Sequence, residues 1–223
     1  MELIEYADAE MMMIDLANRL AGELREALGR DETASLAVPG GTTPGPIFDS
    51  LSSVDLDWDR VKVLLTDERW VPEDSPRSNT GLVKRRLMTD RAASATYVPL
   101  YLPKEQPEEA MEELSAAVGA LNPISVVLLG MGADMHTASL FPGADRLAEG
   151  LTTEAPLVAM RAPGAPEARI TLSAKMLNDA VRRHIVITGE AKREALEKAR
   201  SLPPEEAPVA AILKNAVVHW AKE

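Results

Sequence analysis

Short apolar runs alternate with segments of helical periodicity along most of the chain. In residues 8–28, methionine and leucine recur every three or four positions, which predicts an amphipathic helix. Helices that recur between apolar strands require a mainly parallel sheet covered on both faces. The sequence therefore predicts a Rossmann-like, doubly wound α/β fold. Further helices are expected at 44–51, 79–88, 107–121, 174–180 and 190–199, and strands at 35–38, 61–65, 96–102, 125–129, 157–160, 170–172, 184–188 and 209–213.

Length and composition fit one globular domain. The chain has 223 residues, of which 46% are hydrophobic and 26% charged, and this balance excludes a disordered chain. No repeat or low-complexity segment interrupts it, and the proline-rich stretch 162–166 is as compatible with a surface loop as with a linker. We expect a single domain over 1–223, and a monomer.

The net charge of −11 narrows the possible partners. A polyanionic nucleic acid would be repelled overall, whereas local arginine and lysine groups could still hold one small anion. The chain has no cysteine, so it has no disulfide and no thiol nucleophile. The N-terminal residues lack the pattern of a signal peptide and no apolar run reaches the ~18 residues that span a bilayer, so we expect no membrane association and a cytoplasmic location.

His136 is the first candidate for chemistry. The apolar run 126–129 leads into a glycine-rich turn that delivers Asp134 and His136 two residues apart. Ligands of open α/β sheets bind beyond the carboxyl ends of the strands, and a carboxylate beside an imidazole orients it for acid–base work. A capping or structural histidine remains the alternative.

A second candidate is the segment Gly40-Gly41-Thr42-Thr43-Pro44, which follows an expected strand and opens an expected helix. Its backbone N–H groups and hydroxyls could converge on an anion. It is no Walker loop because no Gly-Lys-Ser/Thr follows, and Met135 prevents the later glycines from completing a dinucleotide fingerprint. A plain turn with a threonine cap is equally compatible with the pattern.

Charged residues follow other expected elements. Asp67 and Arg69 come directly after the strand 61–65, although a surface ion pair would give the same pattern. Arg169 begins a strand, and Lys192 lies in the first turn of a helix, where a cation opposes the helix dipole unless an anion is bound. Taken singly, Arg169 and Lys192 are better read as solvated surface. His184 and His219 have no nearby acids in the sequence, and we assign them no role.

Several segments together resemble the 6-phosphogluconolactonase family. They are Pro39 to Pro44, Thr66-Asp67-Glu68-Arg69-Trp70-Val71-Pro72 with Ser78-Asn79, Gly130 to Gly143, Arg169 to Leu172, and Gly189 to Lys192. They occur in the family's order. The combination is specific, whereas no single segment is.

This resemblance implies a fold related to glucosamine-6-phosphate deaminase and ribose-5-phosphate isomerase. It implies hydrolysis of 6-phospho-D-glucono-1,5-lactone, a sugar-phosphate lactone of the pentose phosphate pathway, with no metal and no organic cofactor. Gly41, Thr42, Arg169 and Lys192 would then surround the substrate phosphate. His136 would be the base that activates water and Asp134 would orient it, while Asp67 and Arg69 would contact sugar hydroxyls or the developing oxyanion.

One position departs from the family pattern. Met135 stands where the family usually has glycine, and we expect the backbone there to keep a glycine-type conformation with positive φ.

Two other functions stay open. One is an aldose–ketose isomerase or deaminase of amino-sugar phosphates, although such deaminases carry Asn-Glu after the histidine; the other is a sugar-phosphate sensor without turnover, although the chain has no output module.

Overall fold

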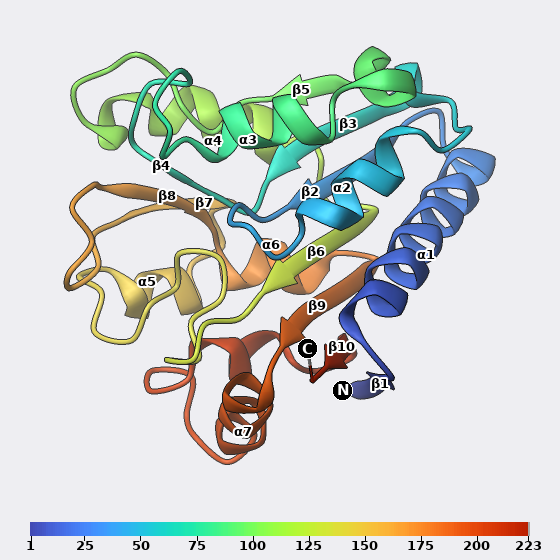
Figure 1. The fold of residues 1–223 in the computed structure, drawn as a ribbon. Coiled ribbons are helices and arrows are strands. Elements are labelled where there is room, and N and C mark those ends of the chain that lie inside the picture. The colour runs from blue at the N-terminus through green and yellow to red at the C-terminus, as the bar shows by residue number, and fades with distance from the viewer. Residues whose placement is uncertain (223) are drawn as a thin grey trace.

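The computed structural model describes residues 1–222 and is built on a seven-stranded parallel sheet (Figure 1). All the neighbouring strand pairs run parallel. This confirms the predicted α/β architecture. The strand order across the sheet is β1 (Glu2–Tyr6), β10 (Val217–Ala221), β9 (Arg182–Thr188), β6 (Val126–Gly130), β2 (Ala34–Val38), β3 (Val61–Leu65) and β5 (Thr96–Val98).

The strand order reverses between β2 and β6. From β2 the chain proceeds to β3 and β5 on one side, whereas from β6 it proceeds to β9 and β10 on the other. The loops after β2 and β6 therefore diverge in opposite directions and leave a crevice at the carboxyl edge, where open α/β sheets bind ligands.

Helices cover both faces of this sheet. Helices α1 (Ala9–Arg30), α2 (Gly45–Ser52) and α3 (Asn79–Arg86) contact one another in series, and in Figure 1 α1 and α2 lie in front of the sheet. Asp8 caps α1 by accepting a hydrogen bond from the Met11 N–H. In the same view α6 lies behind the sheet. The remaining helices are α4 (Met111–Gly119), α5 (Leu147–Thr152), α6 (Ala174–Asp179) and α7 (Glu190–Ala199).

A second, antiparallel sheet extends from the first. It consists of β4 (Asp67–Arg69), β8 (Arg169–Leu172) and β7 (Leu157–Met160), in that order. Thr66 joins the two sheets, because its N–H donates to the Val38 carbonyl of β2 and its carbonyl accepts from the Leu172 N–H of β8. The register places Arg69 opposite Arg169 at the end of this small sheet.

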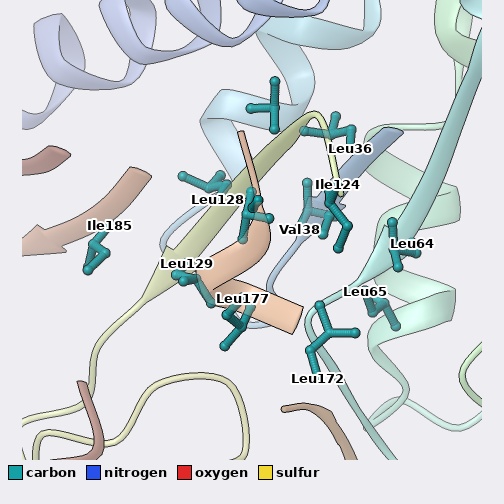
Figure 2. Close-up of a cluster of buried hydrophobic side chains, with 14 of the residues drawn as sticks. Leu36, Val38, Leu64, Leu65, Ile124, Leu128, Leu129, Leu172, Leu177 and Ile185 are labelled. Carbon is teal, nitrogen blue, oxygen red and sulfur yellow. The ribbon is translucent and has the colours of Figure 1, made fainter. Parts of the chain in front are cut away.

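The apolar core continues across that joint. Figure 2 shows Val38, Leu65 and Leu129 of the parallel sheet together with Leu172 of β8 and Leu177 of α6, and all five side chains are fully buried. Burying each leucine contributes about 1.5–3 kcal/mol to folding. The packing fixes the ends of β2, β3 and β6, from which the loops of the crevice depart.

Some expected elements differ. Residues 209–213 form no strand: Pro208 has a fixed φ and no N–H, and the chain makes a 3₁₀ helix over Pro208–Ile212. The expected helix 107–121 is a 3₁₀ turn (Pro107–Ala110) followed by α4, and the strand 96–102 ends at Val98 because Pro99 follows. Strands β7 and β8 belong to the small sheet, and the strands β1, β4 and β10 and the helix α5 were not expected.

Candidate active site

The crevice between β2 and β6 is a cleft of about 300 Å³. It brings together three segments that lie far apart in the sequence: the loop after β2, the strand β4 and the turn after β6. Seven of the eight site residues expected from the sequence line it, namely His136, Asp67, Arg69, Gly41, Thr42, Arg169 and Lys192, and the eighth, Asp134, contacts His136.

The turn after β6 forms an acid–histidine pair. His136 Nδ1 lies 2.5 Å from Asp134 Oδ1, and the same oxygen accepts a hydrogen bond from the His136 backbone N–H. A carboxylate can only accept, so Nδ1 carries a proton and Nε2 of a neutral imidazole keeps its lone pair. A Cβ at Gly132 would lie 2.3 Å from the imidazole, so glycine is required beneath the pair.

Met135 has the expected glycine-type backbone, with φ of 67°. Its N–H donates to the Gly132 carbonyl and closes the turn, while its own carbonyl accepts from the Val209 N–H in the 3₁₀ helix before β10. The loop therefore keeps its shape without glycine, and His136 faces the cleft.

The loop Gly40–Thr43 leads from β2 to α2 along another side of the cleft. Gly41 has φ of 85°, and neither threonine caps α2, whose N-cap is Pro44 without a side-chain hydrogen bond. The threonine-cap alternative is therefore wrong. Gly41 and Thr42 are exposed, which leaves their backbone groups accessible at the helix start, where an anion is favoured.

Asp67 is held from two sides. Thr66 Oγ1 donates to Oδ1 at 3.1 Å, Ser139 Oγ donates to Oδ2 at 2.6 Å, and Arg169 Nη1 lies 3.8 Å from Oδ2. Each carboxylate oxygen keeps a further lone pair that a substrate hydroxyl could use.

Arg69 is held by Asn79, a residue to which we assigned no role from the sequence. Arg69 Nη1 donates to Asn79 Oδ1 at 3.0 Å, and Asn79 Nδ2 donates to the Asp67 carbonyl. Asn79 also packs on Gly40, where a Cβ would lie 2.0 Å from its amide oxygen. Arg69 Nε is buried without a hydrogen-bond partner among the described residues.

Glu68 anchors this arrangement from below. Its carboxylate is fully buried and accepts hydrogen bonds from the backbone N–H groups of Arg69, Asn79 and Thr80, and from the hydroxyls of Ser78 and Thr80. It fixes the start of α3 against β4. A buried residue whose function depends on a helix eleven residues away leaves no local signal in the sequence.

Two cations lie on the remaining side of the cleft. Arg169 is 9% exposed, and burial lowers the pKa of its guanidinium although Asp67 opposes that effect. Its Nε is buried without a partner in the part of the chain that the structure describes. Lys192 lies in the first turn of α7 and has no ion pair within residues 1–222. Lys192 is therefore free to meet an anionic group, and Arg169 lines the same cleft with its Nη1 3.8 Å from Asp67 Oδ2.

The two other histidines, His184 and His219, contact each other, and an acid lies close to them in space. Their strands bring His184 within 2.7 Å of Glu23 Oε2, and His184 Nδ1 lies 3.0 Å from His219 Nε2. Acids are therefore close in space although none is close in the sequence. These rings lie outside the cleft.

Residues 1–222 contain no group of three or more histidine or carboxylate side chains that could hold a metal ion. Within the same residues no helix is long and apolar enough to cross a membrane.

A family model for glucosamine-6-phosphate isomerases/6-phosphogluconolactonase matches residues 7–220. The chain belongs to this family. A 6-phosphogluconolactonase of Rhizobium meliloti is 44% identical over 214 residues, which are 92% of each chain. The crystal structure of a 6-phosphogluconolactonase from Shewanella baltica superposes with a TM-score of 0.92 and 34% identity, covering 99% of this chain and 97% of that one.

The other branch of the family shares the fold. A monomeric glucosamine-6-phosphate deaminase superposes with a TM-score of 0.79 at 18% identity, over 100% of this chain and 98% of that one. This likeness concerns the fold alone.

Proposed function

We propose that this chain hydrolyses 6-phospho-D-glucono-1,5-lactone to 6-phosphogluconate. The observation that carries the proposal is a single cleft, at the point where the strand order reverses, that holds an acid–histidine pair and three cations. The 6-phosphogluconolactonases among its relatives support the substrate class. An overall charge of −11 makes the cluster of Arg69, Arg169 and Lys192 a local exception that suits a phosphate ester.

The phosphate is bound by Gly41, Thr42, Arg169 and Lys192. Backbone N–H groups at the start of α2 and the ammonium at the start of α7 face the same cleft, so an anion between them satisfies both helix dipoles. This gives Lys192, which would otherwise oppose the dipole of α7, a favourable role.

His136 Nε2 takes a proton from water as the water oxygen attacks the lactone carbonyl carbon. Asp134 holds the ring and stabilises the imidazolium, and Arg69, which lines the cleft, stabilises the oxyanion. The tetrahedral intermediate collapses with cleavage of the ring C–O bond, and the departing ring oxygen takes the proton back from His136. The Asp67 carboxylate accepts a hydrogen bond from a hydroxyl group of the sugar. No step needs a metal or cofactor.

All of these groups come from one chain, which supports a single-domain catalytic unit acting as a monomer. We also propose the cytoplasm as its location. The matching family model also covers glucosamine-6-phosphate isomerases, which favours a second candidate, deamination or isomerisation of an amino-sugar phosphate.

The decisive experiment generates the phosphorylated lactone in situ and follows acid release above the spontaneous rate. Glucosamine 6-phosphate is assayed in parallel. Turnover of the lactone alone, lost in His136→Ala, is expected. Turnover of glucosamine 6-phosphate alone would assign the second candidate, and tight binding without turnover of either compound would make the chain a sensor.

A further inference from the structure

The cleft contains an aromatic ring with no part in the mechanism above. Phe141 is one of only two phenylalanines in the chain and lies five residues after His136. It lines the cleft and is half-buried. A phenyl ring at a polar, sugar-sized site needs an explanation, because apolar surface left in contact with water is unfavourable.

The ring contacts two of the functional groups. The imidazole of His136 stacks on it, with ring centroids 4.3 Å apart and planes inclined by 30°. The guanidinium carbon of Arg169 lies 5.5 Å from the centroid of the same ring. Both distances are within the range in which an aromatic face attracts a cation or stacks with a planar group.

Neither functional group is well fixed without this ring. The imidazole has one hydrogen-bonded nitrogen, at Asp134, and a single bond leaves the ring plane free to turn. Arg169 reaches Ser139 at 3.4 Å and Asp67 at 3.8 Å, both long, and its Nε has no hydrogen-bond partner within residues 1–222. The stack supplies the second constraint in each case.

We propose that Phe141 is a positioning residue. Its aromatic face fixes both the plane of the His136 imidazole, the general base, and the position of the Arg169 guanidinium, which binds the phosphate. The inference rests on the proposed function for its consequence. Holding both groups on one rigid ring fixes the distance between the base and the phosphate-binding guanidinium. A ring that merely filled the cleft wall would affect stability alone.

The kinetic test uses Phe141→Leu, which keeps apolar volume but removes the aromatic face. We expect kcat/KM for the phosphorylated lactone to fall about ten- to a hundredfold, because loss of orientation is costly in rate. With neutral gluconolactone the fall should be smaller and confined to kcat, because only the base is then affected. Phe141→Tyr keeps the ring and should restore most activity.

The matched control is Phe48→Leu. Phe48 is fully buried in α2 and contributes to no site group. This variant should lower the melting temperature by cavity formation, as large-to-small core changes do, while kcat and KM for both lactones remain those of the unchanged chain.

A second measurement does not depend on turnover. An imidazole stacked on a phenyl face is shielded by its ring current, so the NMR signal of the His136 C2 proton should lie upfield and move downfield in Phe141→Leu but not in Phe48→Leu. His136→Ala assigns the signal among three histidines.

The outcomes separate the two proposals. An upfield signal in a chain without lactonase turnover would overturn the proposed function and leave the His136–Phe141 contact standing. Unchanged shift and kinetics in Phe141→Leu would overturn the positioning role. Equal losses with the phosphorylated and neutral lactones would overturn the coupling to Arg169.

Discussion

Two acid–histidine arrangements in this chain share their chemistry and differ in burial. In the cleft, the side chains of His136 and Asp134 are 30% and 54% exposed. In the interior, those of His184 and Glu23 are 1% and 16% exposed. The first pair is made within one turn, whereas the second joins strand β9 to helix α1 across 161 residues.

The interior arrangement continues beyond this pair. His184 Nδ1 meets His219 Nε2, and His219 Nδ1 lies 2.9 Å from the Tyr6 hydroxyl, which donates to Asp15. Tyrosine has one hydroxyl proton, so His219 Nδ1 must be the donor toward Tyr6. The chain of contacts ties β1, α1, β9 and β10 together.

The two regions differ in whether a histidine ring keeps a nitrogen that is not hydrogen-bonded to the protein. Both ring nitrogens of His184 and of His219 are hydrogen-bonded within the protein, so neither ring can accept a proton from a ligand. His136 uses Nδ1 alone for Asp134, and its Nε2 has no partner among the described residues. A general base needs both an orienting acid and an accessible lone pair. We therefore expect the cleft to control activity and the interior to control stability.

The largest expected effect is on activity in His136→Ala. Removing a general base lowers kcat by a factor of about 10²–10⁴, and because the side chain is half-exposed the midpoint of urea unfolding should stay unchanged. Binding of 6-phosphogluconate, measured by calorimetry, should persist. Activity near that of the unchanged chain would remove His136 from the mechanism and erase the distinction between the two regions.

Lys192→Gln extends the comparison to the cations of the cleft. A charge-assisted contact is worth roughly 1.5–3 kcal/mol, so kcat/KM for the phosphorylated lactone should fall about ten- to a hundredfold. Neutral gluconolactone should be a poor substrate that hardly responds. Lys198→Gln, at the other end of α7 and outside the cleft, is the matched control and should leave both activities unchanged. Equal losses with both lactones would contradict a role at the phosphate.

The same contrast explains what the sequence could predict. Asp134 and His136 are two residues apart at the end of an apolar run, so local pattern and strand direction suffice to place them in the cleft. Glu23, His184 and His219 meet only because β9 pairs with β10 and α1 packs beside them. No local pattern encodes that pairing, so the sequence could not show that acids lie beside these histidines.

Fold elements follow the same rule. Apolar runs next to glycine or proline, such as β2 and β6, were predictable, because strands that are buried on both faces carry mostly apolar side chains. Edge strand β1 is partly exposed and carries Glu2 and Glu5, so its pattern is weak and its partner lies some 200 residues away. Residues 209–213 are apolar, but Pro208 opens a 3₁₀ helix that continues to Ile212.

His219→Gln tests the interior by its pH dependence. Burial, with His184 and Arg19, lowers the pKa of His219 to about 3 although Asp15 opposes this shift, whereas an unfolded histidine titrates near 6.5. Between these values the unfolded state holds a proton that the folded state lacks. The free energy of unfolding therefore falls as the pH falls below about 6.5, and is unaffected by this group above it.

A glutamine at position 219 can accept a hydrogen bond from His184 and donate one to the Tyr6 hydroxyl, but it does not titrate. Between pH 7 and pH 5, urea unfolding of the unchanged chain should therefore lose about 2 kcal/mol more than that of His219→Gln, since each unit of pH is worth about 1.4 kcal/mol. The lactonase kcat should be the same in both at pH 7. Equal losses on acidification would show that His219 is protonated in the folded state.

Met135→Gly is the smallest of the expected effects and the one that could break the division between cleft and interior. Met135 lies in the cleft loop with φ of 67°, where a side chain costs roughly 1–2 kcal/mol. Glycine removes that cost but adds about 0.4–1 kcal/mol of unfolded-state entropy. We expect stability to hold or rise by up to about 1 kcal/mol, and kcat to hold or rise.

Ala133→Gly provides the matched control for Met135→Gly, because Ala133 lies in the same turn with an ordinary φ and is exposed. Ala133→Gly raises the conformational entropy of the unfolded chain without relieving strain in the folded one. It should therefore lower the free energy of unfolding by about 0.4–1 kcal/mol. The difference between the two variants in urea unfolding therefore isolates the cost of the positive φ. If Met135→Gly lost as much stability as Ala133→Gly, the methionine would be unstrained. In that case the contacts of the Met135 side chain, rather than a glycine-type backbone, would hold His136 in place.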